Sequence, residues 1–158
     1  MDASSLISLF GQEAGIALAL NDAGTAALAI EGGPTLHLEH DPQADVLHCY
    51  VVIGPVPADP ARRQEVFRQM LAANVFGRDT AGATLGLDEV AGELVLSRRL
   101  ELPRADTAWL RATVESMAAV AQDWRQRLGG ASPDAGGSGA LPAGAAAGTL
   151  PPDFGLRV

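Results

Sequence analysis

Apolar residues recur along the chain with two periods, and these separate predicted helices from predicted strands. Three segments have an apolar residue every three or four positions, as helices do: residues 4–20, 60–77 and 107–128. Five shorter segments have the apolar composition or alternation of strands: residues 25–30, 35–40, 46–53, 84–88 and 93–100. The predicted order is α-β-β-β-α-β-β-α. Because short turns join the strands, this order favours an α+β fold with helices packed on an antiparallel twisted sheet.

Residues with strong preferences for helix ends support these boundaries. Ser4 or Ser5 is placed to cap the first helix. Asp59 is placed to cap the second helix, with Pro60 at its first helical position. Gly77 is its predicted end, since glycine readily adopts the left-handed conformation that ends many helices.

The composition of the chain changes near its C-terminal end. Residues 129–158 are rich in Gly, Ala, Pro and Ser and carry few charged side chains. Such a segment buries too little apolar area to offset the entropy lost on folding. The sequence therefore predicts a folded domain over residues 1–128 and a disordered tail over 129–158. Phe154 and Leu156 are the tail residues best suited to dock on the domain.

The charge of the chain restricts its partners. The formal net charge is −8, and every basic residue is Arg. An acidic surface repels nucleic-acid backbones, so a role in nucleic-acid binding is not expected. The same field favours a protein partner that carries a basic segment.

The compartment is predicted from cysteine usage and hydropathy. Cys49 is the only cysteine and has no internal disulfide partner, which favours a reducing compartment. No apolar run approaches the ~20 residues of a membrane-spanning helix. The first residues, MDASSLISLF, lack the basic start of a secretory signal. We therefore expect a cytoplasmic protein without a membrane span.

Three histidines and the cysteine suggest a metal site, which the geometry of strands opposes. His37 and His40 are an odd number of positions apart, and so are His48 and Cys49. Side chains at odd separations point to opposite faces of a strand. At most one histidine from each strand can converge, which is too few for a metal site. No metal or other cofactor is expected.

Candidate catalytic groups are equally isolated. Glu31, Glu39 and Asp41 fall at predicted strand ends and turns, where carboxylates are usually solvated. His48 points away from Cys49, which therefore has no activating base and is better explained as a packed core thiol. The sequence thus predicts that the protein is not an enzyme.

With catalytic and metal sites not expected, the apolar stripes of the predicted helices and strands are the main remaining evidence on function. Phe67, Met70, Leu71 and Val75 form a stripe on the second helix that is wider than one small sheet face needs. Either all of this surface is core, or part of it is covered by a second chain. We expect a homodimer.

The order of the predicted elements, the size of the chain and several short sequence segments resemble the class I chaperones of bacterial type III secretion, which have the CesT-type fold (Tir chaperone family). The resemblance extends over residues 4–128 and departs from the family in the tail. The matching segments are GTAALAI, TLHLEH, VVIGPVP, MLAANVFGRDTAGATLGLD, GELVLSRRL and WRQRL.

The resemblance implies a homodimer that binds the N-terminal segment of one or more secreted effectors and keeps it extended without ATP. It implies binding patches on the first helix and the sheet, often with backbone pairing at a strand edge. The implied effector-binding residues are Leu6, Leu9, Phe10, Leu28, Ile30, Leu36 and Leu38. The implied dimer interface contains Phe67, Met70, Leu71, Val75, Leu85 and Leu87.

Two alternatives stay open at this point. The seven effector-binding residues are equally well explained as core residues. A protein of the same fold can also act outside secretion, as a module that holds a regulator or shields a toxin. The resemblance also leaves open a contact with the ATPase of the secretion system.

Overall fold

The structure, a computed structural model, describes residues 1–129 and 146–150. Within these ranges the helices are α1 (Ala3–Ala14), α2 (Pro60–Asn74) and α3 (Thr107–Arg127). The strands are β1 (Thr25–Ile30), β2 (Thr35–Asp41), β3 (Val46–Pro55), β4 (Thr84–Asp88), β5 (Glu93–Glu101) and β6 (Ala146–Leu150). The strands form one sheet in the order β4-β5-β3-β2-β1-β6. The predicted α-β-β-β-α-β-β-α order is confirmed, and β6 follows it.

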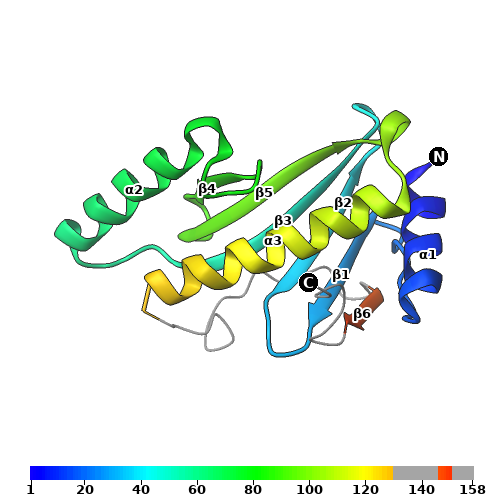
Figure 1. Cartoon of the computed structure of the whole chain (residues 1–158), viewed down its shortest axis with the longest axis horizontal. Coiled ribbons are helices and arrows are strands. Elements are labelled where there is room, and N and C mark those ends of the chain that lie inside the picture. The colour runs from blue at the N-terminus through cyan, green and yellow to red at the C-terminus, as the bar shows by residue number, and fades with distance from the viewer. Residues whose placement is uncertain (130–145, 151–158) are drawn as a thin grey trace.

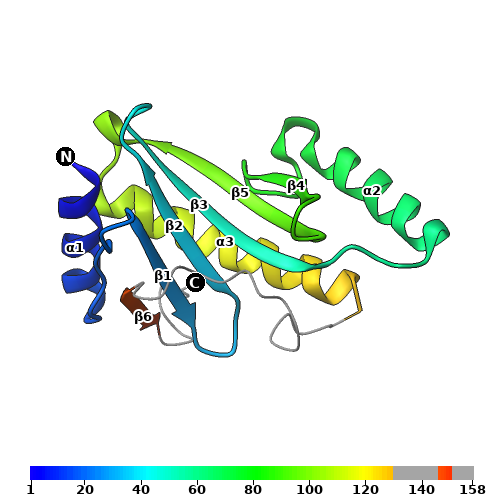
Figure 2. The same ribbon diagram turned by 180° about the vertical axis from the view of Figure 1, so that it is seen from behind.

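The helices are distributed unevenly around the sheet. α3 runs across one face, and α1 packs beside it at the β1 end (Figure 1). α2 lies at the opposite end, where it contacts β4 rather than covering the sheet. Figure 2 shows the other face of the sheet, which none of these helices covers.

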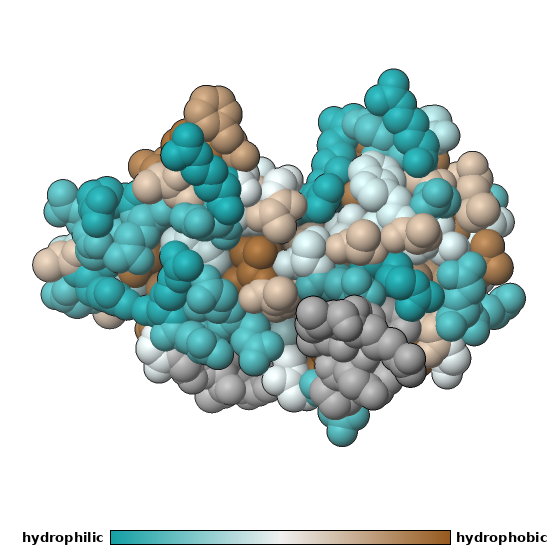
Figure 3. Space-filling view, in the orientation of Figure 1, coloured by the Kyte–Doolittle hydropathy of each residue, from teal (hydrophilic) through white to brown (hydrophobic). Residues whose placement is uncertain are grey.

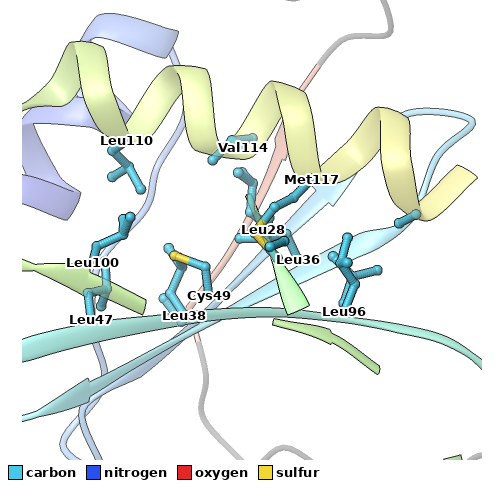
Figure 4. Close-up of a cluster of buried hydrophobic side chains, with 14 of the residues drawn as sticks. Leu28, Leu36, Leu38, Leu47, Cys49, Leu96, Leu100, Leu110, Val114 and Met117 are labelled. Carbon is cyan, nitrogen blue, oxygen red and sulfur yellow. The ribbon is translucent and has the colours of Figure 1, made fainter. Parts of the chain in front are cut away.

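The core lies between α3 and the inner face of the sheet. Leu110, Val114 and Met117 point from α3 toward leucines of β1, β2, β3 and β5 (Figure 4). Cys49 lies among them and is fully buried, as predicted for a packed thiol. Burial raises the pKa of the Cys49 thiol to about 12, so the thiolate needed for nucleophilic chemistry does not form near neutral pH. The labelled sheet residues of this cluster are Leu28, Leu36, Leu38, Leu47, Cys49, Leu96 and Leu100.

The outer face of the sheet is largely polar. His37 pairs across the strands with Tyr50, and the two rings stack with centroids 4.9 Å apart. His48 lies between Glu39 and Arg99 in the same register. This face therefore needs no covering helix. No group of three or more His, Cys, Asp or Glu side chains that could hold a metal occurs in the described parts of the chain.

Both ends of α1, where Ser4 or Ser5 was the predicted cap, and the C-terminal end of α2 differ from the prediction. α1 ends at Ala14, not near residue 20, because Gly15 adopts a left-handed conformation with φ 71°. Its N-cap is Asp2, whose side chain accepts a hydrogen bond from the Ser5 amide at 3.0 Å. α2 begins as predicted but ends at Asn74, and Gly77 is the last residue of the 3₁₀ turn, Val75–Gly77, that follows it.

The prediction that the whole tail is disordered is wrong for residues 146–150. These residues form β6, which pairs in parallel with β1, so the sheet is mixed rather than purely antiparallel. Strand pairing uses backbone groups, which a segment without an apolar stripe still provides. The rest of the tail, with Phe154 and Leu156, lies outside the described residues.

Candidate functional site

α2 has two apolar faces. Val66, Met70 and Ala73 are buried on the inner face. Leu71, which follows Met70, lies on the outer face and is 71% exposed, whereas Phe67 is partly buried and packs against the core. The single stripe predicted from the sequence is therefore divided between the core and the surface. An amphipathic helix needs only the first of these faces to fold against its own sheet.

The outer face of α2 continues as a broader apolar surface, which we call the α2 surface. It comprises the exposed residues Leu71, Val75 and Phe76 and the partly buried Phe67. Leu87, which was also predicted for the interface, is 41% exposed on β4. A shallow groove along it is lined by Pro60, Arg63, Gln64, Phe67, Arg68 and Leu71. In Figure 3 most of this end of the molecule is hydrophilic, and apolar side chains gather at its upper projection. Two residues predicted for the interface, Met70 and Leu85, are instead core residues, at 6% and 5% exposure.

Phe76 is the most exposed member of the α2 surface, at 89%. Its backbone is left-handed, with φ 56°, a conformation that costs a residue other than glycine roughly 1–2 kcal/mol. Gly77 follows at φ 64°, and a Cβ there would lie 3.0 Å from the Gly82 backbone. The turn thus holds an aromatic ring in solvent at an energetic cost. Such strain is found at functional sites, and the sequence pattern gave no indication of it.

Asn74 attaches the end of α2 to β4. Its side-chain oxygen accepts a hydrogen bond from the Leu85 amide at 2.9 Å, and its side-chain nitrogen donates to the Leu85 carbonyl at 3.0 Å. The amide side chain thus pairs with Leu85 as a neighbouring strand would. This pairing fixes the position of the α2 surface and was missed in the sequence.

Asn74→Ala is expected to lower the free energy of unfolding by about 1–3 kcal/mol, because both Leu85 backbone groups lose their partner. Urea unfolding measures this change. Gln69→Ala is the matched control, since the Gln69 amide donates its hydrogen bond to Glu65 on the same helix and does not connect α2 to β4. Equal stability of the Asn74→Ala and Gln69→Ala variants would contradict the role of Asn74.

The structure separates the predicted effector-binding residues into two groups. Five of them are core residues with at most 1% exposure: Leu6, Phe10, Leu28, Leu36 and Leu38. They cannot contact a partner from there, and we remove them from the site. Leu9 is 38% exposed, and Ile30 is partly buried against the core. For these two residues, effector binding stays a prediction.

An open depression lies on the outer face of the sheet. Tyr50 lines this depression, and His37 stacks on the Tyr50 ring. Burial raises the pKa of Tyr50 and lowers the pKa of His37, so both side chains are favoured in their neutral forms. The mixture of acidic, aromatic and aliphatic side chains suits contact with a peptide. The lining residues are Glu39, His48, Tyr50, Leu87, Asp88, Glu89, Val95 and Ser97.

Comparison with known families identifies the fold. A model of the Tir chaperone protein (CesT) family matches residues 5–125. The chain belongs to this family. No match was found among curated proteins. In the part of the chain that the structure describes, no helix is long and apolar enough to cross a bilayer.

Solved structures share the CesT-family fold at low sequence identity. A chain of the ExsC–ExsE complex is 22% identical with a TM-score of 0.67, over 84% of this chain and 100% of that chain. A chain of the HopA1–SchA chaperone–effector complex is 21% identical with a TM-score of 0.64, over 77% and 91%. A chain of the ExoU–SpcU complex from the Pseudomonas aeruginosa type III secretion system is 21% identical with a TM-score of 0.61, over 78% and 95%.

Proposed function

We propose that this protein is a type III secretion chaperone. In this role it binds the N-terminal chaperone-binding segment of one or more effectors in the bacterial cytoplasm and keeps it extended for secretion without ATP. The observation that carries the proposal is the family match over residues 5–125. The fold shared with chains of chaperone–effector complexes supports it. The net charge of −8 suits a partner segment with basic residues.

Dimer formation through the α2 surface is part of the proposal. The surface carries exposed Leu71 and Phe76 next to a β4 strand that Asn74 holds in place. Exposed apolar residues that gather in this way are typical of protein–protein contacts. A twofold interface buries the same patch on both copies, so one surface is enough to form it.

The effector segment is expected at the opposite end of the sheet, around α1 and β1. Leu9 and Ile30 offer partly exposed apolar contacts there. A strand edge adds backbone hydrogen bonds that tolerate varied sequences, which suits a chaperone with more than one effector. The proposal assigns no catalysis to the protein. The burial of Cys49, which raises the pKa of its thiol to about 12, supports this view.

Copurification tests the function. The tagged protein is isolated from its native host, and bound chains are identified by mass spectrometry. We expect to find a bound chain that is exported by the secretion system. Deleting the N-terminal segment of that chain should abolish its binding to the chaperone. Leu9→Asp is expected to reduce capture at least tenfold, whereas Val90→Asp, at a fully exposed turn position, is the control.

The outcome also separates the alternatives. A bound chain that stays inside the cell, such as a regulator or a toxin, would contradict a secretion role and favour a binding module outside secretion. If none of the captured chains needs its N-terminal segment for binding, the chaperone function itself is contradicted.

A further inference from the structure

β6 occupies the edge of the sheet next to β1. The two strands run in parallel, and the register pairs Leu28 with Gly148 and Ile30 with Leu150. The Glu31 amide donates a hydrogen bond to the Leu150 carbonyl at 2.9 Å. Leu150 is 1% exposed, whereas Thr149 is exposed. β6 is therefore bound through its backbone and one buried aliphatic side chain.

The wall beside β6 selects a small residue at one position. A Cβ added at Gly148 would lie 2.9 Å from the Ile16 side chain and 3.3 Å from the Ala17 carbonyl oxygen. It would also lie 3.4 Å from the Leu18 side chain. Residues 16–18 belong to the segment that joins α1 to β1, so a carbonyl and two side chains close this space. The site accepts an extended segment with a small residue, then any residue, then an aliphatic one.

β6 lies outside the part of the chain that matches the family. The family match ends at residue 125, and β1 is an edge strand of the sheet formed by β1–β5. An edge strand presents backbone groups that a second chain can pair with. Here residues 146–150 of the same chain satisfy those groups.

We propose that residues 146–150 are a built-in occupant of the β1 edge, and that an extended segment of another chain must displace them to bind there. This proposal rests on the proposed function, because it names a regulated part of the same binding region. The external segment has a Gly or Ala followed two positions later by an aliphatic residue, and it runs parallel to β1. The C-terminal tail thus acts as a competitor for secreted segments.

The physical consequence is a lower apparent affinity for external segments. β6 is joined covalently to its site, so its effective concentration is on the order of millimolar. The apparent dissociation constant of a competitor is its intrinsic dissociation constant divided by the fraction of sites that β6 leaves free. A weak external segment is therefore rejected, and only a segment with further contacts on the chaperone displaces β6.

Amide exchange in the full-length protein tests the occupancy. Gly148→Val places a branched side chain against the wall and should release β6. We expect the Glu31 amide to exchange with solvent at least tenfold faster in this variant, while the amides of β3 keep their wild-type protection. Gly86→Val is the matched control at the opposite edge, where a Cβ has ordinary contacts at 3.6 Å, and Glu31 should stay protected.

Peptide binding tests the competition. The probe is a labelled peptide with the sequence of residues 143–152, AGAAAGTLPP. We expect it to bind Gly148→Val at least tenfold more tightly than wild type or Gly86→Val. The same peptide with Val in place of the glycine that corresponds to Gly148 should not bind. Because the probe is the chain's own sequence, the result does not depend on whether an effector exists.

Three results would overturn the proposal. Unchanged Glu31 exchange in Gly148→Val would show that β6 does not depend on the wall. Faster exchange throughout β3 would show that β6 is an integral part of the fold. Equal peptide affinity for wild type and Gly148→Val would show that β6 does not compete. The chaperone function would stand after each of these results, since copurification decides it separately.

Discussion

Leu36→Asp is expected to unfold the protein, whereas Leu9→Asp is expected to leave it folded. Both residues were predicted from the sequence to bind an effector, but Leu36 is fully buried and Leu9 is 38% exposed. Leucine truncation in a core costs about 2–5 kcal/mol. An unpaired buried carboxylate costs several kcal/mol more. The sum is comparable to the whole stability of a typical domain, about 5–15 kcal/mol.

Circular dichroism during heating and urea unfolding measure this difference. Leu36→Met is the matched control, because it conserves volume in the core and should cost less than about 1.5 kcal/mol. A cooperative transition near the wild-type midpoint in Leu36→Asp would contradict the core assignment. Loss of the fold in Leu9→Asp would contradict the assignment of Leu9 to the surface.

The order of elements could be predicted because each depends on local pattern. The α2 start follows from Asp59 and Pro60, which cap and begin the helix in the structure as the sequence indicated. The α3 start follows in the same way from Asp106, whose side chain accepts a hydrogen bond from the Trp109 amide at 2.7 Å. Local chemistry of this kind needs no information from the rest of the fold.

The covered and uncovered apolar residues could not be distinguished from the sequence. Met70 and Leu71 are adjacent and equally apolar, yet one is 6% exposed and the other 71%. Their difference depends on where β4 lies relative to α2, which is a property of the tertiary structure. Leu6 and Leu9 on α1 differ for the same reason. Hydrophobic patterning identifies residues that need burial but not the partner that buries them.

β6 was missed for a different reason. The signal for a strand is apolar alternation, and AAGTL offers only one large aliphatic side chain. The structure instead uses the small size of Gly148, where an added Cβ would lie 2.9 Å from the Ile16 side chain and 3.3 Å from the Ala17 carbonyl oxygen. The signal that was available is the Gly-Thr-Leu sequence itself, which interrupts the small residues of the tail. It acquires meaning only when the open edge of β1 is known.

Leu71→Asp is expected to convert a dimer into a monomer without unfolding the chain. Leu71 is 71% exposed in the single chain, so its replacement disturbs no contact of the core. In a dimer formed through the α2 surface, each copy loses about 1.5–3 kcal/mol of apolar burial and gains a charge that lacks a partner. A twofold interface contains the substitution twice, which raises the dissociation constant on the order of a thousandfold or more. Sedimentation at micromolar concentration should give twice the 16.2 kDa chain mass for wild type and 16.2 kDa for the variant.

Two further variants show whether the α2 surface is responsible for dimer formation. Phe76→Asp lies on the same surface and should also give a monomer, whereas Val90→Asp adds the same charge at a fully exposed turn and should stay dimeric. Circular dichroism should show the wild-type fold in all three variants. A wild-type protein that sediments at 16.2 kDa would refute the dimer. Dimeric Leu71→Asp and Phe76→Asp variants would place the interface elsewhere, because a desolvated, unpaired carboxylate is not tolerated at the centre of a packed contact.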